Sequence, residues 1–141
     1  MPAANPTGFL DTNVLLYAYD TDSPAKRLKA RKWVERGWEF PGEISISVQV
    51  LQELAVNLEK KKVSKGEIHQ ILFDLSAWPV VDNTLLLLKL ALGEQLRWQI
   101  SLWDAMILAA ARSCGAEELI SEDFNHGQDY DGIRAVNPFR G

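Results

Sequence analysis

Apolar positions along the chain fall into short runs separated by longer segments of helical spacing. The short runs predict five strands, at residues 7–10, 44–47, 78–82, 119–121 and 133–136. The longer segments predict helices at residues 13–19, 24–36, 48–61, 65–75, 83–98 and 101–113. Strands that alternate with helices are typical of an α/β fold with a mainly parallel central sheet. Functional sites in such sheets form at the carboxyl ends of the strands.

Composition indicates one ordinary globular domain spanning residues 1–141. The chain length is close to the commonest domain size, and 47% of the residues are hydrophobic. Cys114 is the only cysteine, so no internal disulfide forms and a cytoplasmic location is expected. No membrane association is expected, because the densest apolar run, residues 85–88, is broken by Lys89. Residues 1–6 lack the basic and apolar regions of a secretion signal.

The charge pattern leaves two interpretations of the basic side chains open. The net charge is −4, from 15 Lys and Arg against 19 Asp and Glu, which argues against binding of nucleic acid by bulk charge alone. Basic residues nevertheless crowd two segments, residues 26–36 and 60–65. These segments are either solvated helix faces or a rim that contacts phosphates around an acidic centre. On the second interpretation Arg27 and Arg31 are expected to contribute nonspecific RNA affinity.

Three acidic side chains stand where an α/β fold places a site. Asp11 ends the first predicted strand, where it is either a helix N-cap or a metal ligand. Glu53 lies at the edge of the apolar stripe of its helix, a position that a solvated glutamate also takes. Asp123 follows the fourth strand in an acidic loop, and Glu122 and Asp129 are near enough to share its role.

Asp104 is the strongest single candidate. It is the only polar residue from Leu102 to Ala111, and a helix that is apolar on all sides is expected to be buried. Burial of an unpartnered carboxylate is very costly, so a functional partner is indicated. The alternative is a capping box, in which Ser101 is the N-cap and Asp104 stands three residues later.

Taken together, the four acids indicate a divalent-metal site. Carboxylate and water oxygens are the preferred ligands of Mg²⁺ and Mn²⁺, and such a cation activates water and binds phosphoryl oxygen. The sequence has no phosphate-binding glycine loop, no dinucleotide-binding fingerprint and no nucleophile elbow. The five tryptophans are assigned mainly to the core, and Trp38 or Trp98 is the alternative for stacking on RNA bases.

Four segments, in order along the chain, resemble those of the PIN-domain ribonucleases, and in particular of the VapC-type toxins of type II toxin–antitoxin systems. They are FLDTNVLL at residues 9–16, Ser47 with VLQEL at 50–54, SLWDAMILAAA at 101–111 and LISEDF at 119–124. The close of the chain, Val136-Asn137-Pro138-Phe139, is also similar. The resemblance covers essentially the whole chain and implies a single PIN-like domain, an α/β/α sandwich around a mainly parallel sheet.

The resemblance also implies a site and a function. Asp11, Glu53, Asp104 and Asp123 correspond to an acidic quartet that holds Mg²⁺ or Mn²⁺, and Thr12, Asn13 and Ser121 correspond to its polar supports. The implied activity is endoribonuclease hydrolysis of RNA phosphodiester bonds. The implied partners are an RNA substrate, a cognate antitoxin that occludes the site and a second copy of the chain.

Two other interpretations of the sequence remain open. A receiver domain has the same kind of sheet, with Asp11 or Asp82 as phosphoacceptor, but the first strand offers one acid instead of an acidic pair. A catalytically inactive PIN module would serve only for protein binding, and the presence of all four acids argues against it.

Overall fold

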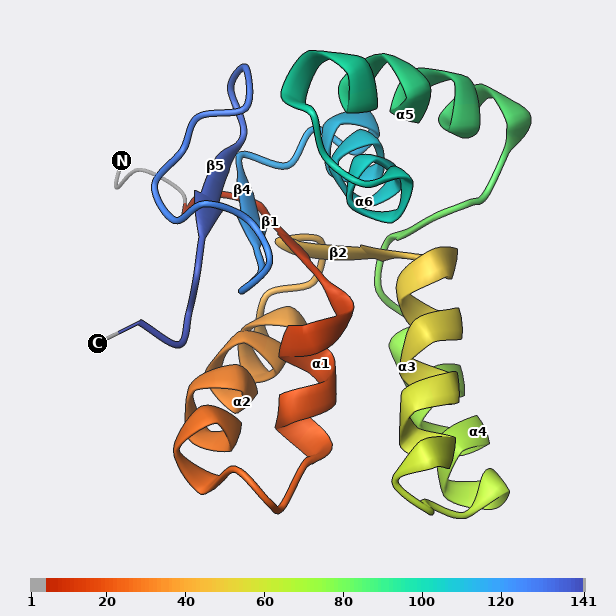
Figure 1. Cartoon of the computed structure of the whole chain (residues 1–141). Coiled ribbons are helices and arrows are strands. Elements are labelled where there is room, and N and C mark those ends of the chain that lie inside the picture. Colours follow the sequence, from red (N-terminus) through yellow and green to blue (C-terminus); the bar gives the residue numbers. More distant parts are fainter. Residues whose placement is uncertain (1–4, 141) are drawn as a thin grey trace.

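The computed structural model describes residues 5–140; residue 141 and residues 1–4, most of the segment assessed for a secretion signal, lie outside the described part. Within it, five strands alternate with helices (Figure 1). The strands are β1 (Gly8–Leu10), β2 (Ile44–Ser47), β3 (Val80–Val81), β4 (Glu118–Ile120) and β5 (Arg134–Val136). The helices are α1 (Thr12–Tyr19), α2 (Pro24–Glu39), α3 (Val48–Lys60), α4 (Lys65–Leu75), α5 (Leu85–Trp98) and α6 (Leu102–Ser113).

The predicted elements are all present, with differences at their ends. The main differences are an α2 that continues to Glu39 and a β3 of only two residues. Pro79 has no N–H to donate to a neighbouring strand, which explains why β3 begins after it. Its carbonyl still accepts a hydrogen bond from the Ile46 N–H, at 3.0 Å.

All five strands are parallel, in the order β3-β2-β1-β4-β5. The predicted α/β fold with a mainly parallel sheet is therefore confirmed. β1 occupies the centre of the sheet, and its three residues are all buried. A strand covered on both faces has to be apolar throughout, so β1 shows no alternation of polar and apolar positions.

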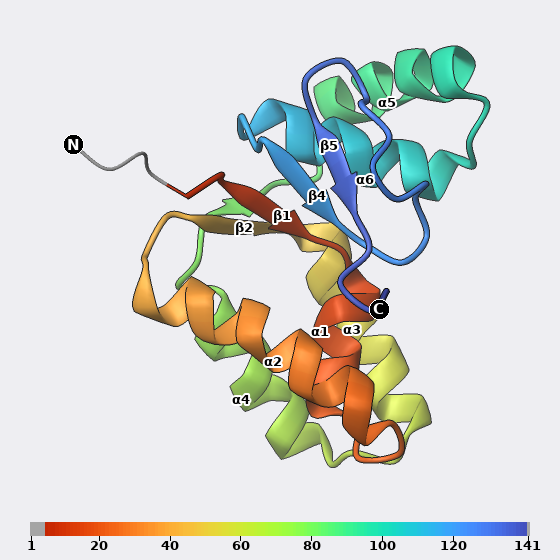
Figure 2. The same ribbon diagram turned by 90° about the vertical axis from the view of Figure 1, so that its left-hand side faces the viewer.

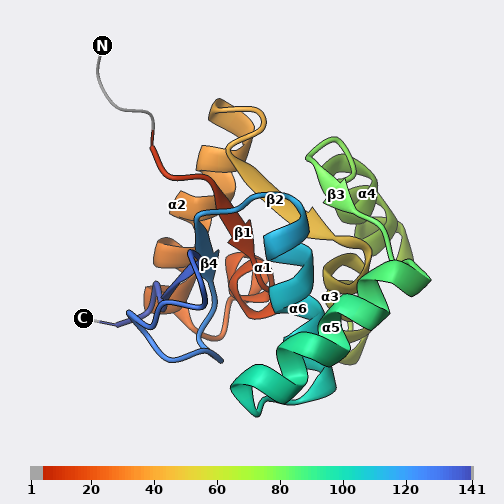
Figure 3. The same ribbon diagram turned by 90° about the horizontal axis from the view of Figure 1, so that it is seen from above.

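Helices cover both faces of this sheet. α5 and α6 lie on one face, and α1 to α4 lie on the other (Figures 1 and 2). Seen from above, α6 lies over the sheet beside β1 and β2, and α5 lies outside α6 (Figure 3). The arrangement is the α/β/α sandwich that the resemblance implied. None of the described helices is long and apolar enough to cross a membrane.

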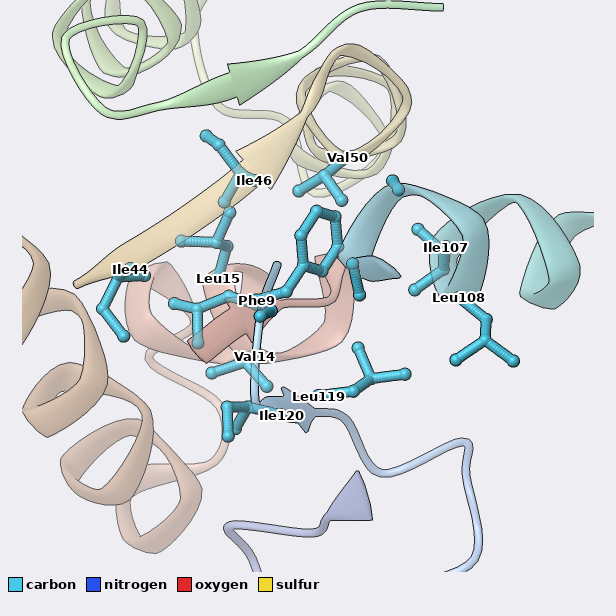
Figure 4. Packing of buried hydrophobic residues seen from close by; sticks show 14 of the residues in the cluster. Phe9, Val14, Leu15, Ile44, Ile46, Val50, Ile107, Leu108, Leu119 and Ile120 are labelled. Carbon is cyan, nitrogen blue, oxygen red and sulfur yellow. The ribbon is translucent and has the colours of Figure 1, made fainter. Parts of the chain in front are cut away.

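Side chains from the sheet and from both helical layers form the core (Figure 4). Phe9 of β1, Leu15 of α1, Val50 of α3, Leu108 of α6 and Ile120 of β4 are each fully buried. Burial of a side chain of this size contributes about 1.5–3 kcal/mol. These contacts hold α1, α3 and α6 against the sheet. Helix α1 begins directly after Asp11, α3 carries Glu53 and α6 carries Asp104.

Backbone hydrogen bonds continue the sheet one residue past the carboxyl ends of β1 and β4. The N–H of Asp11 donates to the carbonyl of Ile120 at 3.0 Å, and the N–H of Ser121 donates to the carbonyl of Val136 at 3.0 Å. These bonds continue the parallel pairing by one residue on each strand. Asp11 and Ser121, 110 positions apart in the chain, are therefore neighbours at one edge of the sheet.

Gly37 provides a test of the packing between α2 and the segment before β3. A Cβ at this buried position would overlap the indole of Trp78. Gly37→Ala is therefore expected to lower the free energy of unfolding by about 1–3 kcal/mol, the usual cost of overpacking. Gly66→Ala is the matched control, because nothing lies within 4 Å of its Cβ position. Urea denaturation should find the control as stable as the parent or up to about 1 kcal/mol more stable; equal stability of both variants would contradict the packing.

Candidate active site

The four acids predicted from the sequence line one pocket of about 200 Å³. Asp11 follows β1, and Asp123 lies in the loop after β4. Glu53 comes from the second turn of α3, and Asp104 from the first turn of α6. Because these elements end or begin at the carboxyl edge of the parallel sheet, side chains separated by up to 112 positions share one cavity. The structure brings together all four residues of the predicted quartet.

Asp11 is the most deeply enclosed of the four, with 4% of its surface exposed. Its carboxylate accepts hydrogen bonds from the Ser121 hydroxyl at 2.8 Å and from the Thr12 N–H at 2.7 Å. Burial is the largest cause that raises the pKa of Asp11, and the charges of Asp123 and Glu53 add to it, so the pKa is about 7. The two hydrogen bonds lower the pKa but do not offset the burial. The Thr12 contact also makes Asp11 the N-cap of α1, so both interpretations of this residue apply.

Glu53 is held by two polar neighbours. The Thr12 hydroxyl donates to Glu53 Oε1 at 3.0 Å, and Gln49 Nε2 donates to the same oxygen at 3.3 Å. Gln49 is one turn before Glu53 on α3, and its amide also donates to the carbonyl of Trp103 at 3.3 Å. Gln49 was not predicted as a site residue, although its i, i+4 spacing from Glu53 places the two on one helix face. Asn57, one turn after Glu53, also lines the pocket.

Asn13 and Ser121 orient the loop that carries Asp123. The Asn13 side-chain amide donates to Asp123 Oδ2 at 3.1 Å and to the Ser121 hydroxyl at 3.3 Å. The same hydroxyl accepts from the N–H of Asp123 at 3.0 Å. Ser121 thus contacts both Asp11 and the Asp123 loop, which links two acids of the pocket through one buried hydroxyl.

The structure distinguishes Asp123 from the two acids that were near enough to share its role. Glu122 forms an ion pair with Lys26 at 3.1 Å and does not line the pocket. Asp129 accepts a hydrogen bond from the Gly132 N–H at 2.7 Å, within its own turn. Of the three, only Asp123 has its side chain on the pocket wall.

Both interpretations of Asp104 apply at once. The Ser101 hydroxyl accepts from the Asp104 N–H at 3.1 Å, so Ser101 is the N-cap of α6. The carboxylate is half-buried in the pocket, where desolvation, Asp123 and Glu53 raise its pKa. The expectation that this helix is buried on all sides was wrong at its first turn. Trp103 is 66% exposed there, so its assignment to the core was wrong as well.

The pocket has an excess of negative charge at close range. Among the described residues, those that line it include four carboxylates and no lysine or arginine. None of the four carboxylates forms an ion pair with a lysine or arginine of the described residues. Within residues 5–140, no three Asp, Glu, His or Cys side chains are arranged so that they could hold a metal ion together. Mg²⁺ usually keeps several of its waters and takes only one or two carboxylates directly, so it fits this donor set.

The two arginines expected to contact RNA lie on α2 and do not line the pocket. Arg31 is exposed, and its Nε donates to the carbonyl of Ala18 at 3.4 Å. Arg27 is half-buried. Lys26, also on α2, reaches the loop that carries Asp123 through its ion pair with Glu122.

A sequence model of the PIN domain family matches residues 8–128 of the chain. A comparison with curated proteins finds no match. The matched range contains all four acids of the pocket.

Solved structures share the fold at low identity. A chain of a toxin–antitoxin complex from Klebsiella pneumoniae is 22% identical, with 94% of this chain and 98% of that chain covered and a TM-score of 0.68. The Sarcin–Ricin loop cleaving toxin VapC20 from Mycobacterium tuberculosis is 20% identical, with 80% and 87% covered and a TM-score of 0.58. VapBC2 from Rickettsia felis, bound to a DNA fragment from its promoter, is 22% identical, with 82% and 86% covered and a TM-score of 0.57.

The raised pKa of Asp11 predicts how the metal-free protein responds to pH. Unfolded aspartate has a pKa near 3.8, so between about pH 4 and 7 only the folded state retains this proton. The group has no effect on stability below pH 4, and it lowers the free energy of unfolding by up to about 1.4 kcal/mol per pH unit as pH rises to 7. In EDTA, Asp11→Asn is expected to flatten this decline.

Urea melts of the parent and the variant at half-unit pH steps measure this effect. Asp82→Asn, a change at an exposed aspartate outside the pocket, is the control and should keep the parent's decline. An Asp11→Asn protein that declines as steeply as the parent would show that the proton is bound elsewhere.

Proposed function

The chain belongs to the PIN domain family, and on that basis we propose that it is an endoribonuclease that hydrolyses RNA phosphodiester bonds with Mg²⁺ or Mn²⁺. The observation that carries the proposal is the pocket in which Asp11, Glu53, Asp104 and Asp123 meet without a basic side chain. Like charges at this density raise the free energy of the metal-free fold, and a bound cation would lower it. RNA supplies phosphate oxygens, which such a cation binds well.

One or two of the four acids would bind the cation directly and the others through its waters, and the remaining polar side chains would position the acids. When bound, the metal would supply a polarised water for attack on phosphorus and stabilise the charge that develops on the phosphoryl oxygens. Ser121 and the Thr12 N–H orient the Asp11 carboxylate. Thr12 also binds Glu53, and Asn13 binds Asp123. Asp11, Glu53 and Asp123 are thereby restricted to few orientations, which is the usual role of residues that support metal ligands.

The two other interpretations have less support. A phosphoacceptor aspartate has to be accessible to a phosphodonor, but Asp11 is almost fully buried and hydrogen-bonded. Asp82 is exposed but lies outside the acidic pocket. An inactive PIN module would need no acidic pocket. Here hydrogen bonds orient Asp11, Glu53 and Asp123, which argues that the pocket binds a ligand.

The similar structures support a toxin role and an antitoxin partner. These include a toxin–antitoxin complex and a toxin that cleaves the Sarcin–Ricin loop. The chain also has an open groove of about 590 Å³, lined by Tyr19, Trp38, Ile71 and Phe73. Phe73 is 81% exposed there, which is typical of a surface that a protein partner covers. We propose that the antitoxin binds in this groove. We also propose that the complex is located in the cytoplasm.

A second copy of the chain is the proposed occupant of the outer side of α5. Leucines recur on that side three or four residues apart, at Leu85, Leu88, Leu92 and Leu96, which places them on one helical stripe. All four are exposed, and Leu96 is 79% exposed. The opposite side, with Leu87 and Ala91, is buried. Two such stripes packed together are self-complementary, as a two-fold dimer requires.

RNA bound next to the acids would also pass the basic helix α2. Arg27 and Arg31 are proposed as phosphate contacts there, which add affinity without reading sequence. The exposed position of Arg31 is compatible with this role.

The nuclease proposal predicts RNA cleavage that requires Mg²⁺ or Mn²⁺ and stops in excess EDTA. Asp104→Asn should reduce cleavage by more than about 100-fold, because loss of a ligand exceeds the 10–100-fold typical of a supporting residue. Asn13→Ala should fall within that smaller range. Glu122→Gln, which alters the acid next to Asp123 but outside the pocket, should cleave normally. Gel assays on purified variants test this, and cleavage that persists in EDTA would exclude the metal mechanism.

If α5 forms the dimer interface, a charged residue placed in its leucine stripe should lower the molecular mass of the protein in solution. Leu92→Glu should convert the dimer to a monomer, because two carboxylates would be buried in the apolar stripe without partners. Leu28→Glu is the control, since Leu28 is 68% exposed on α2. Sedimentation equilibrium should give a dimer mass for the parent and the control; a parent that is monomeric at high concentration would exclude this interface.

A further inference from the structure

Trp103 is an exposed aromatic side chain on the wall of the acidic pocket. It is the residue before Asp104 in the first turn of α6, and it is 66% exposed. Most of the apolar residues that follow it on α6, from Ala105 to Ala111, are buried against the rest of the fold. Hydrophobic burial therefore does not explain why the largest side chain of the helix faces solvent.

The backbone of Trp103 is fixed relative to the acids. Its carbonyl accepts a hydrogen bond from Gln49, whose amide also binds Glu53. The next residue along the chain is Asp104, held at the helix start by Ser101. The indole has only two side-chain torsions, so little conformational entropy is lost when it contacts a ligand. The structure thus holds the backbone that carries a flat, exposed apolar side chain beside the carboxylates.

We propose that Trp103 stacks on a nucleobase of the RNA next to the phosphate that occupies the acidic pocket. The inference rests on the proposed function and names how that site binds its substrate. Single-stranded RNA is recognised largely by stacking of splayed bases on aromatic side chains. Phosphate and base belong to one nucleotide, and the acids and Trp103 line one pocket, so one bound nucleotide contacts both.

The nucleobase is favoured over a protein segment as the occupant of this surface. The pocket beside Trp103 is lined in part by four carboxylates and three side-chain amides, which an apolar peptide side chain would desolvate without compensation. A base has a π face for the indole, and its polar edges still offer hydrogen-bonding groups to the polar lining of the pocket. Trp38 and Trp98, the tryptophans considered for stacking from the sequence, pack instead against Trp78 and Tyr130.

The test compares RNA that has bases with RNA that lacks them. The full chain carries Asp11→Asn, which prevents hydrolysis. Fluorescence anisotropy in Mg²⁺ measures how tightly this protein binds fluorescein-labelled decauridine and a labelled abasic ribose–phosphate decamer. Adding Trp103→Ala should weaken decauridine binding about 5- to 100-fold, the range for one base–aromatic stack. Binding of the abasic decamer should not change. Trp103→Phe should restore most of the decauridine affinity, because a phenyl ring still stacks.

Two further variants separate stacking from other effects. Trp38→Ala removes the other largely exposed indole, outside the pocket, and should leave both affinities unchanged. Arg31→Glu should weaken both oligomers equally and flatten the salt dependence, because a phosphate contact does not depend on bases. Trp103→Ala should leave the salt dependence as it was.

The outcomes for the inference and for the nuclease proposal are distinct. Equal weakening of both oligomers by Trp103→Ala, no weakening of either, or no binding of either oligomer by the parent would overturn the stacking role. A change from dimer to monomer with unchanged RNA affinity would overturn it in favour of a protein contact. Base-dependent loss of binding together with no cleavage by the wild-type chain in Mg²⁺ would support stacking and reject the nuclease activity.

Discussion

The parallel pairing of β1 with β4 is the constraint on which the site depends. It joins segments about 110 residues apart, and its last hydrogen bond, from the Asp11 N–H to the Ile120 carbonyl, lies directly beneath the pocket. Through this pairing Ser121 reaches the carboxylate of Asp11, and Asn13 reaches Asp123. The pairing is maintained by the buried apolar layer on both faces of β1, so the geometry of the polar site is a consequence of core packing.

The pocket combines this geometry with unfavourable electrostatics. Burial and like charge raise the pKa values of Asp11 and Asp104, which means that the metal-free fold resists full ionisation of its own acids. Hydrogen bonds from Ser121, Thr12 and Gln49 keep the side chains in place despite that repulsion. A site that is costly when empty and preorganised by neighbours is suited to bind a cation, because binding both neutralises charge and needs little rearrangement.

The fold leaves three apolar surfaces exposed to solvent. Trp103 lies beside the acids, the leucine stripe lies on the outer side of α5, and an aromatic groove borders α2 and α4. These three surfaces are on different elements and differ in character: one is a single flat ring among polar groups, one is aliphatic and regular, and one is concave and aromatic. We propose a substrate base, a second copy of the chain and a partner protein as their respective occupants.

The sequence by itself determined the order and type of the elements, the parallel sheet and the four acids, because apolar periodicity and strand-end positions are local features of the chain. It did not decide whether Asp123, Glu122 or Asp129 is the fourth acid of the site. It also missed Gln49 and assigned Trp103 to the core. Only the tertiary structure decided these points. Whether a side chain faces the pocket depends on which distant segment packs against it. Glu122 forms an ion pair with Lys26 of α2 and lies outside the pocket, whereas Trp103 binds Gln49 of α3 through its backbone carbonyl and its indole is exposed.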